Sequence, residues 1–296
     1  MKKIKIGFFA DGPWSHIALQ KIIQNPLIEL AFICARHNST DKTLENKANE
    51  IKVDFFTVKD INSTESINLL VKYSADLFVS MSFNQIFRSE ILSVPPKGII
   101  NCHAGKLPFY RGRNILNWVL INDEKEFGIT VHYVDEGIDT GDIILQRLYG
   151  IIDDDNYETL LNRAYPACAD ILLEAIEMIA SGSLVRIKQA DINLNGMYCT
   201  ARVLGDEIIN WHQSSRKIFN FVRALSTPGP EATSYLNGEK IKIKKVIYLP
   251  SAPKYIGIPG AIIGFEGDSF LVKTLDTYVK VTEWSCNVRP KIGDRL

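Results

Sequence analysis

The sequence predicts an α/β protein: a mostly parallel, Rossmann-like sheet with flanking helices, followed by a small OB-like β-barrel domain. Two observations lead to this prediction. The first half alternates short apolar runs with segments of helical periodicity, which is typical of βαβ units. The pattern changes after Gln189, and beyond Pro230 short strand-like runs recur between turn signals, which favours a small barrel.

The elements of the first half follow from the spacing of apolar residues. Continuous apolar runs predict buried strands, and apolar residues three or four positions apart predict helices. We expect strands at 4–9, 28–34, 55–58, 77–81 and 99–100, and helices at 16–23, 43–50 and 66–73. Strands joined by helices should give right-handed crossovers.

The second half continues with a helix at 115–121 and strands at 128–134 and 143–151. A long helix then runs towards Ser181, with Asp155 or Asn156 as its cap. A helix at 211–225 precedes five strands, at 232–236, 240–249, 261–265, 269–274 and 278–284. The predicted domains are therefore 1–189 and 206–296, with a linker at 190–205.

Composition excludes several classes of protein. The 296 residues are 46% hydrophobic with zero net charge, which argues against a broad surface for nucleic acid. Five widely spaced cysteines without a CxxC motif argue against disulfides and zinc, and we expect no metal. No apolar run approaches the ~20 residues of a membrane span, so we expect a cytoplasmic protein without a membrane partner.

Polar side chains follow the apolar run Gly98-Ile99-Ile100, at the end of a predicted strand where α/β sheets usually carry their sites. Asn101 and His103 are two apart and should face the same side, with Cys102 turned into the core. An imidazole can move protons near neutral pH, and an amide can stabilise an oxyanion, which together suit acyl transfer.

A carboxylate for this site is expected from the segment 135–142. The residue pattern alone does not choose among Asp135, Asp139 and Asp142. A second segment, Asp11 to Trp14, follows the first strand where a ligand could also approach. It lacks the glycine spacing of a dinucleotide-binding loop.

The chain resembles the folate-dependent formyltransferases, on three motifs: Asn101-Cys102-His103, the acidic segment 135–142, and the block 107–120 with Arg111-Gly112-Arg113. The last block is most similar to enzymes that formylate nucleotide-linked amino sugars such as UDP-4-amino-4-deoxy-L-arabinose. The two-domain layout is like that of methionyl-tRNA formyltransferase. The resemblance covers most of the chain, and it implies that Asn101, His103 and Asp139 are catalytic.

The resemblance also implies a co-substrate, N10-formyltetrahydrofolate, whose pterin would bind near residues 80–86. The cofactor-binding candidates are Ser82, Phe83, Ile86 and Asp135. Phe83 and Ile86 are equally well interpreted as ordinary core, and turn formation is the favoured interpretation of Asp135 and Asp142.

The substrate-binding candidates are Arg111, Arg113 and Lys106. Guanidinium groups suit a phosphate or carboxylate, so the arginines either bind a nucleotide diphosphate or the folate glutamate, or brace the loop. Gly105 and Lys106 depart from the Ser-Leu found in many relatives, which separates this chain from methionyl-tRNA formyltransferases.

The predicted function is formyl transfer from N10-formyltetrahydrofolate to the amine of a UDP-, dTDP- or GDP-linked amino sugar. The alternative is a methionyl-tRNA formyltransferase, which usually carries a basic loop that residues 34–43 lack. A non-catalytic binding protein and a formyl-folate hydrolase are further alternatives. A homodimer and a role in lipopolysaccharide precursor synthesis are expectations from the family.

Overall fold

The computed structural model describes residues 3–296, which form two compact units. The N-terminal unit contains residues 3–112, Phe127–Tyr149 and Asn162–Cys199. The C-terminal unit contains Arg113–Glu126, Gly150–Leu161 and Thr200–Leu296. The chain therefore passes between the units several times, whereas the sequence predicts one linker at 190–205; those domain limits stay a prediction. Within residues 3–296 no helix is long and apolar enough to span a membrane.

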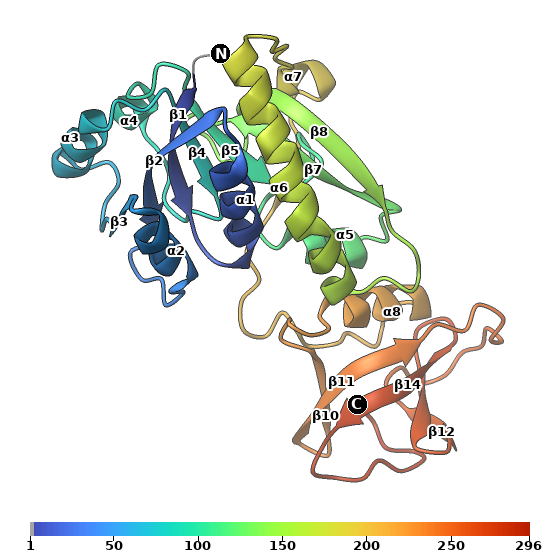
Figure 1. The fold of residues 1–296 in the computed structure, drawn as a ribbon. Helices are drawn as coiled ribbons and strands as arrows, with labels where there is room; N and C mark the ends of the chain where they lie inside the picture. The colour runs from blue at the N-terminus through green and yellow to red at the C-terminus, as the bar shows by residue number, and fades with distance from the viewer. Residues whose placement is uncertain (1–2) are drawn as a thin grey trace. The chain divides into compact units, whose positions relative to one another are not determined.

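A seven-stranded sheet forms the centre of the N-terminal unit, in the order β3-β2-β1-β4-β5-β7-β8 (Figure 1). The first five of these strands in that order pair in parallel, and β5 pairs with β7 antiparallel. The mostly parallel sheet predicted from the sequence is confirmed. Their bounds are β1 Ile4–Ala10, β2 Ile28–Ala35, β3 Asp54–Thr57, β4 Leu77–Met81, β5 Ile99–His103, β7 Glu126–Tyr133 and β8 Ile143–Gly150.

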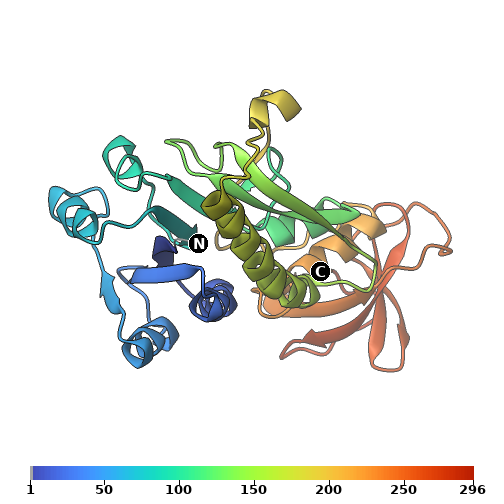
Figure 2. The ribbon, with the colours of Figure 1, turned by 45° about the horizontal axis from the view of Figure 1, so that its top comes forward.

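The helices beside this sheet include α1 (Pro13–Gln24), α2 (Thr43–Ile51), α3 (Thr64–Lys72) and the long α6 (Tyr157–Ser181). The helices α1 and α6 lie side by side (Figures 1 and 2), and Trp14 meets Tyr165 edge to face at 4.7 Å. Asn156 accepts a hydrogen bond from the Thr159 N–H and so provides the predicted cap of α6.

Four short elements were not expected: α4 (Ser89–Leu92), α7 (Gln189–Ile192) and the paired strands β6 (Arg111–Gly112) and β9 (Tyr198–Cys199). Each has two to four residues, which is too short for a hydrophobic period to show. The predicted linker at 190–205 thus contains the end of α7 and strand β9.

An aromatic cluster fixes the loop that follows β4. Phe9 of β1 contacts Phe32, Phe78, Phe83 and Phe87, with ring centroids 5.2–5.4 Å apart. Edge-to-face pairs of this kind add about 0.5–1.5 kcal/mol each to the burial of the rings. The loop carrying Phe83 and Phe87 is therefore packed against the sheet.

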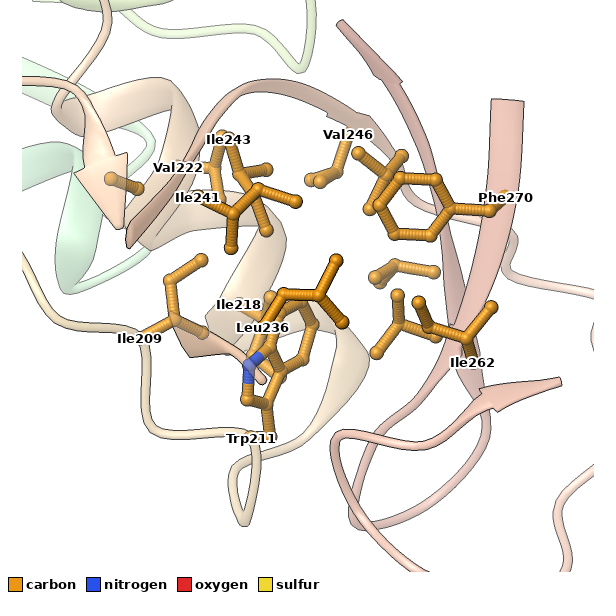
Figure 3. Close-up of a cluster of buried hydrophobic side chains, with 14 of the residues drawn as sticks. Ile209, Trp211, Ile218, Val222, Leu236, Ile241, Ile243, Val246, Ile262 and Phe270 are labelled. Atoms are coloured by element: carbon orange, nitrogen blue, oxygen red, sulfur yellow. The ribbon is translucent and has the colours of Figure 1, made fainter. Parts of the chain in front are cut away.

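The C-terminal unit is built on a five-stranded antiparallel sheet in the order β10-β11-β14-β13-β12. The strands are β10 Ala232–Leu236, β11 Glu239–Ile247, β12 Ile262–Glu266, β13 Ser269–Lys273 and β14 Tyr278–Ser285. All five predicted strands are confirmed. Side chains from these strands and from α8 (Ser215–Ala224) fill one core, which includes Trp211, Ile218 and Phe270 (Figure 3).

Ion pairs hold α8 to two other segments of the same unit. Arg216 pairs with Asp123 and Asp153, and Arg223 donates to the Ile152 carbonyl. The hydrogen bonds from Arg216 hold the pKa of Asp123 well below its usual value. The helix α5 (Ile115–Ile121) is tied in by Asn117, whose amide donates to the Ala224 carbonyl. Residues 113–126 and 150–161 thus belong to this unit by direct contact.

Candidate active site

Strand β5 presents two polar side chains to one face of the sheet. Asn101 stands opposite His132 of β7, and His103 stands opposite Thr130. Cys102 points the other way, and its Sγ lies 3.5 Å from the Cys168 carbonyl of α6. The side-chain alternation expected from the sequence is therefore present in β5, with the thiol packed under α6.

The ring of His103 is held in one orientation. Its Nε2 donates a hydrogen bond to the Tyr110 carbonyl at 2.7 Å. Because a carbonyl oxygen only accepts, Nε2 carries a proton, and in the neutral ring Nδ1 has the free lone pair. Nδ1 faces the Asp139 carboxylate, with 3.6 Å between Nδ1 and Oδ2. His103 is only 8% exposed, so the pair is shielded from water.

Asp139 is placed by its backbone and by three neighbours. It adopts a left-handed φ of 53°, its Oδ2 accepts the Gly112 N–H at 2.8 Å, and its Oδ1 lies 3.5 Å from His132 Nε2. Burial raises the pKa of this carboxyl. The positive charge of His103 in its protonated form, the hydrogen bond and protonated-form charge of His132, and the Gly112 N–H together outweigh this effect of burial. The pKa of Asp139 is therefore held well below its ordinary value, and the group is ionised at neutral pH.

The other acids of the segment have different surroundings. Asp135 is exposed and accepts hydrogen bonds from Thr140 Oγ1 at 2.5 Å and the Gly137 N–H at 3.1 Å. These bonds close a local turn, as the sequence suggested for Asp135. Of the three carboxylates that the sequence could not separate, Asp139 is the one in contact with His103.

His132 joins the cluster. From its place on a predicted strand it could line the site, although a structural hydrogen bond is the interpretation that the sequence favours. Its Nδ1 donates to the Tyr133 carbonyl at 2.7 Å, so Nε2 is the atom that faces the site. Nε2 lies 3.3 Å from the Asn101 amide nitrogen and 3.5 Å from Asp139 Oδ1. A single histidine on a strand gives no signal of this kind, because Asn101 lies 31 positions away in the sequence.

Arg111 is buried, and its guanidinium group forms hydrogen bonds within the protein. Its Nε and Nη2 donate to Gln189 Oε1 at 3.0 and 2.8 Å. Gln189 in turn donates to the carbonyls of Asp139 and Gly141, both at 2.8 Å. The guanidinium therefore braces the Asp139 loop, which is one of the two roles that the sequence left open for it. Gln189 was missed, because its hydrogen-bond partners lie 48 to 78 residues earlier in the chain.

The other two substrate candidates are placed differently. Arg113 is exposed and belongs to the C-terminal unit. Lys106 is half-buried in the N-terminal unit, in a loop pinned by a hydrogen bond from Thr130 Oγ1 to the Gly105 carbonyl at 2.6 Å. Contact of either side chain with a substrate stays a prediction.

Gly105 has a steric reason to be glycine. A Cβ at this position would lie 2.4 Å from His103 Nε2 and 2.5 Å from the Tyr110 carbonyl. A serine at this position would displace the imidazole from its acceptor. Glycine at position 105 therefore leaves the room that the imidazole of His103 occupies.

The loop after β4 carries the other predicted cofactor contacts. Ser82 has a left-handed φ of 62°, and Arg36 donates to its carbonyl at 2.7 Å and to its hydroxyl at 2.9 Å. Phe83 is half-buried against Phe9 and Phe87, whereas Ile86 is 56% exposed. Phe83 is thus partly a core residue, and Ile86 offers an exposed apolar surface.

The cluster of Asn101, His103, Asp139 and His132 brings together an amide donor, a basic ring nitrogen and an ionised carboxylate. These groups can bind a carbonyl oxygen and accept a proton from a nucleophile, which is the chemistry of acyl transfer to an amine. Among residues 3–296 no group of His, Cys, Asp and Glu is arranged to hold a metal ion.

Two family models match the chain: "Formyl transferase" over residues 6–176 and "Formyl transferase, C-terminal domain" over residues 204–291. The chain is similar to the methionyl-tRNA formyltransferase of Syntrophomonas wolfei, with 33% identity over 82% of this chain and 76% of that protein. It is 30% identical to that of Clostridium acetobutylicum, over 95% of this chain and 91% of the relative.

Two solved structures share the fold over nearly the whole chain. One is a sugar 3N-formyl transferase solved with dTDP and 5-N-formyl-THF; the TM-score is 0.72, with 23% identity over 98% of this chain and 100% of that one. The other is an N-formyltransferase from Helicobacter canadensis with folinic acid and dTDP-3-aminofucose; its TM-score is 0.71, with 22% identity over 96% and 100% of the two chains.

Proposed function

The chain belongs to the formyl transferase family, and from this premise we propose that it transfers the formyl group of N10-formyltetrahydrofolate to the amine of a nucleotide-linked amino sugar. The observation that supports the chemistry best is the cluster of Asn101, His103 and Asp139. The co-substrate is proposed from the folate compounds bound by the two structural neighbours.

In the proposed reaction the neutral amine attacks the formyl carbon, and the bond from that carbon to N10 of the folate breaks. The Asn101 amide donates to the carbonyl oxygen as negative charge develops there. The amine loses a proton to His103 Nδ1. This nitrogen lies 3.6 Å from Oδ2 of the ionised Asp139 carboxylate, which stabilises the resulting imidazolium. N10 gains a proton as it leaves, so the proton count is balanced.

His132 completes this proposal as a positioning residue. It contacts both the Asn101 amide and the Asp139 carboxylate through Nε2, so it sets the separation of the oxyanion donor and the acid. On the folate side we keep Ser82, Phe83, Ile86 and Asp135 as proposed contacts. Ile86 is the one whose exposed apolar side chain best suits the face of a pterin.

A nucleotide-linked amino sugar is proposed as acceptor for two reasons. The structural neighbours with dTDP and dTDP-3-aminofucose align over 96–98% of this chain. The chain also has zero net charge, and Arg36, the first cation after β2, is engaged with Ser82. A nucleic-acid acceptor would require cations that are free to pair with phosphates.

The second candidate is methionyl-tRNA, and a specific observation favours it. The relatives from Syntrophomonas wolfei and Clostridium acetobutylicum, at 30–33% identity, are both methionyl-tRNA formyltransferases. The alignment with the Clostridium acetobutylicum relative covers 95% of this chain, and therefore much of the C-terminal unit. The acceptor must therefore be decided by direct competition between the two substrates.

The test incubates the protein and N10-formyltetrahydrofolate with UDP-, dTDP- and GDP-linked amino sugars and, separately, with methionyl-tRNA. Mass spectrometry detects the formyl group on the acceptor. We expect one sugar nucleotide to be formylated, and His103→Ala and Asp139→Ala to abolish the product. Formylation of the tRNA alone would replace the proposed acceptor by the second candidate. Folate consumed without any acceptor would instead indicate hydrolysis.

The setting of the reaction also belongs to the proposal. We place the enzyme in the cytoplasm, as a homodimer, in the synthesis of a lipopolysaccharide or related glycan precursor. The assembly is checked by light scattering of the purified protein, where a monomer mass at working concentration would remove the homodimer from the proposal.

A further inference from the structure

Two side chains outside the loop 104–110 hold its backbone in place. Thr130 of β7 donates from Oγ1 to the Gly105 carbonyl at 2.6 Å. Gln146 of β8 donates from Nε2 to the Leu107 carbonyl at 2.9 Å and to Thr130 Oγ1 at 2.8 Å. Strands β7 and β8 are neighbours in the sheet (Figure 1), so the two side chains act on the loop together. We call them the Thr130–Gln146 pair.

The direction of each hydrogen bond in this pair is fixed. A carbonyl oxygen only accepts, so the single hydroxyl proton of Thr130 goes to Gly105. The Thr130 oxygen then accepts from Gln146, whose amide has two protons, one for Thr130 and one for Leu107. Thr130 is fully buried, so loss of its hydroxyl would leave buried polar groups without their partner.

Gly105 connects the pair to the candidate active site. A Cβ on Gly105 would lie 2.5 Å from the Tyr110 carbonyl oxygen and 2.4 Å from His103 Nε2. Gly105 therefore lies directly against the hydrogen bond that joins these two groups at 2.7 Å. Because hydrogen bonds weaken steeply as their geometry departs from the ideal, a small displacement of Gly105 is enough to disturb this bond.

Two acceptors compete for the one proton of the neutral His103 ring. The Tyr110 carbonyl lies 2.7 Å from Nε2, and Oδ2 of the ionised Asp139 carboxylate lies 3.6 Å from Nδ1. A carboxylate is the stronger acceptor of the two, since hydrogen bonds to a charged group are about twice as strong as neutral ones. The carbonyl keeps the proton on Nε2 by being closer. If it moved away, the proton would transfer to Nδ1, which could then no longer accept a proton from an amine.

We propose that Thr130 and Gln146 are positioning residues that keep the ring proton of His103 on Nε2, by holding Gly105 and Leu107 so that the Tyr110 carbonyl stays within reach. Neither residue touches a reacting atom. This inference rests on the proposed function, because that function requires the free lone pair of Nδ1.

A second anchor of the same loop allows the pair to be tested alone. The Met197 N–H donates to the Pro108 carbonyl at 3.1 Å, and the Met197 carbonyl accepts the Arg111 N–H at 2.9 Å. These bonds lie on both sides of Tyr110 and use backbone groups only. Substitutions at Thr130 or Gln146 leave them in place, so such variants test the pair and not the general attachment of the loop.

The test is nuclear magnetic resonance of the full chain labelled with ¹⁵N in its five histidines. The ring shifts show which nitrogen carries the proton, at alkaline pH once the signals no longer change with pH. His103→Ala identifies the His103 signals. We expect Nε2–H in the wild type and transfer of the proton to Nδ1 in Thr130→Val, which removes the hydroxyl and nearly keeps the shape. A wild-type ring with its proton on Nδ1 would overturn the proposal.

Further variants separate the hydroxyl from folding. Thr130→Ser keeps the hydroxyl and should keep the wild-type ring signals. Gln146→Leu, in the half-buried part of edge strand β8, should transfer the proton in part, and it decides the question alone if Thr130→Val does not fold. The exposed Thr57→Val and Gln20→Leu are the matched controls and should change nothing. Unchanged His103 signals in the folded pair variants would refute the proposal.

Kinetics separate this inference from the proposed function. Thr130→Val should lower kcat for the formylated acceptor by about 3- to 10-fold, the population change that one hydrogen bond of ordinary strength controls, and Thr130→Ser should restore it. KM should stay the same. Formylation with wild-type kcat in Thr130→Val would refute the pair and leave the function in place. Proton transfer to Nδ1 in Thr130→Val, without formylation of any amino sugar by the wild type, would retain the pair and refute the function.

Discussion

At the scale of single residues, the orientation of His103 depends on a backbone carbonyl. The Tyr110 carbonyl accepts a hydrogen bond from the Nε2–H group, which leaves Nδ1 as the nitrogen that faces Asp139. The tautomer is thus selected by a backbone group and needs no further carboxylate. Any substitution that moves the ring from this carbonyl should reduce proton transfer before it affects folding.

Gly105→Ser is expected to lower kcat by about 10-fold or more, because its Cβ would lie 2.4 Å from His103 Nε2. KM for folate should change little, since the folate contacts proposed above are in another loop. Steady-state kinetics check this. Gly150→Ser, where nothing lies within 4 Å of the added Cβ, is the control. Unchanged kcat in Gly105→Ser would show that the ring tolerates displacement.

Cys102→Ser should retain nearly all activity. The thiol is buried and lies against the Cys168 carbonyl on the face of the sheet opposite Asn101 and His103. A nucleophilic role would require it to face the formyl group. The measurement is kcat of the variant beside that of His103→Ala, and a loss comparable to that of the histidine variant would refute this placement.

Asp139 should make the protein sensitive to acid. Its folded pKa is depressed, so its ionisation stabilises the fold fully above the unfolded pKa of about 3.9. That stabilisation, of order 2 kcal/mol, is lost as the pH falls below the unfolded value towards the folded one. Asp139→Asn should therefore lose less stability than the wild type between about pH 5 and pH 2, measured by urea unfolding. The exposed Asp135→Asn should retain the wild-type dependence.

Residues differ in how far the sequence could identify them. Asn101 and His103 were identified from alternation at the end of an apolar run, and both face the site. Asp139 needed the family resemblance, because three acids share one short segment. For His132 the sequence favoured a structural hydrogen bond over a place in the site, and Gln189 was not identified because its partners lie 48 to 78 positions away.

At the scale of elements, the Asp139 loop is held from outside by α7. Gln189 at its start links the Arg111 guanidinium to the carbonyls of Asp139 and Gly141. These hydrogen bonds therefore couple the position of the Asp139 loop to that of strand β6 and α7. Helix α7 itself has only four residues, so its role comes from this one side chain.

Gln189→Leu should lower both stability and kcat. It leaves the buried Arg111 guanidinium and two carbonyls without their partner, which typically costs about 1–3 kcal/mol per unsatisfied group. We expect an unfolding free energy lower by about 2–3 kcal/mol and a reduced kcat as Asp139 loosens. Denaturant unfolding and kinetics check this, with the exposed Gln20→Leu as control. A stable variant with normal kcat would remove Gln189 from the support of the loop.

The strands and helices were predictable where the hydrophobic period is long. Strand β4 was predicted over its full range, and the five strands of the C-terminal unit were found from their turns. The strands β6 and β9 and the helices α4 and α7 were not, because elements of two to four residues show no period. They are held by contacts between distant segments, which no local pattern records.

At the scale of the whole molecule, charge separates the two acceptors. The chain carries 34 basic and 34 acidic residues, so no broad field favours a polyanion. A protein that binds nucleic acid loses about 10³-fold or more in affinity between 50 and 200 mM salt. We expect kcat/KM for the sugar nucleotide to change by less than about 3-fold over this range. A steep salt dependence would instead favour the tRNA.

The division into two units has a consequence for how this enzyme can be taken apart. The C-terminal unit includes Arg113–Glu126 and Gly150–Leu161, which Asn117, Asp123 and Asp153 tie to α8. If the chain were cut near residue 200, the N-terminal fragment would keep these two segments but lose α8, the helix with which they form their bonds. The barrel is therefore not a detachable module, and a chimera that exchanges it with a relative must transplant all three stretches of chain as one graft.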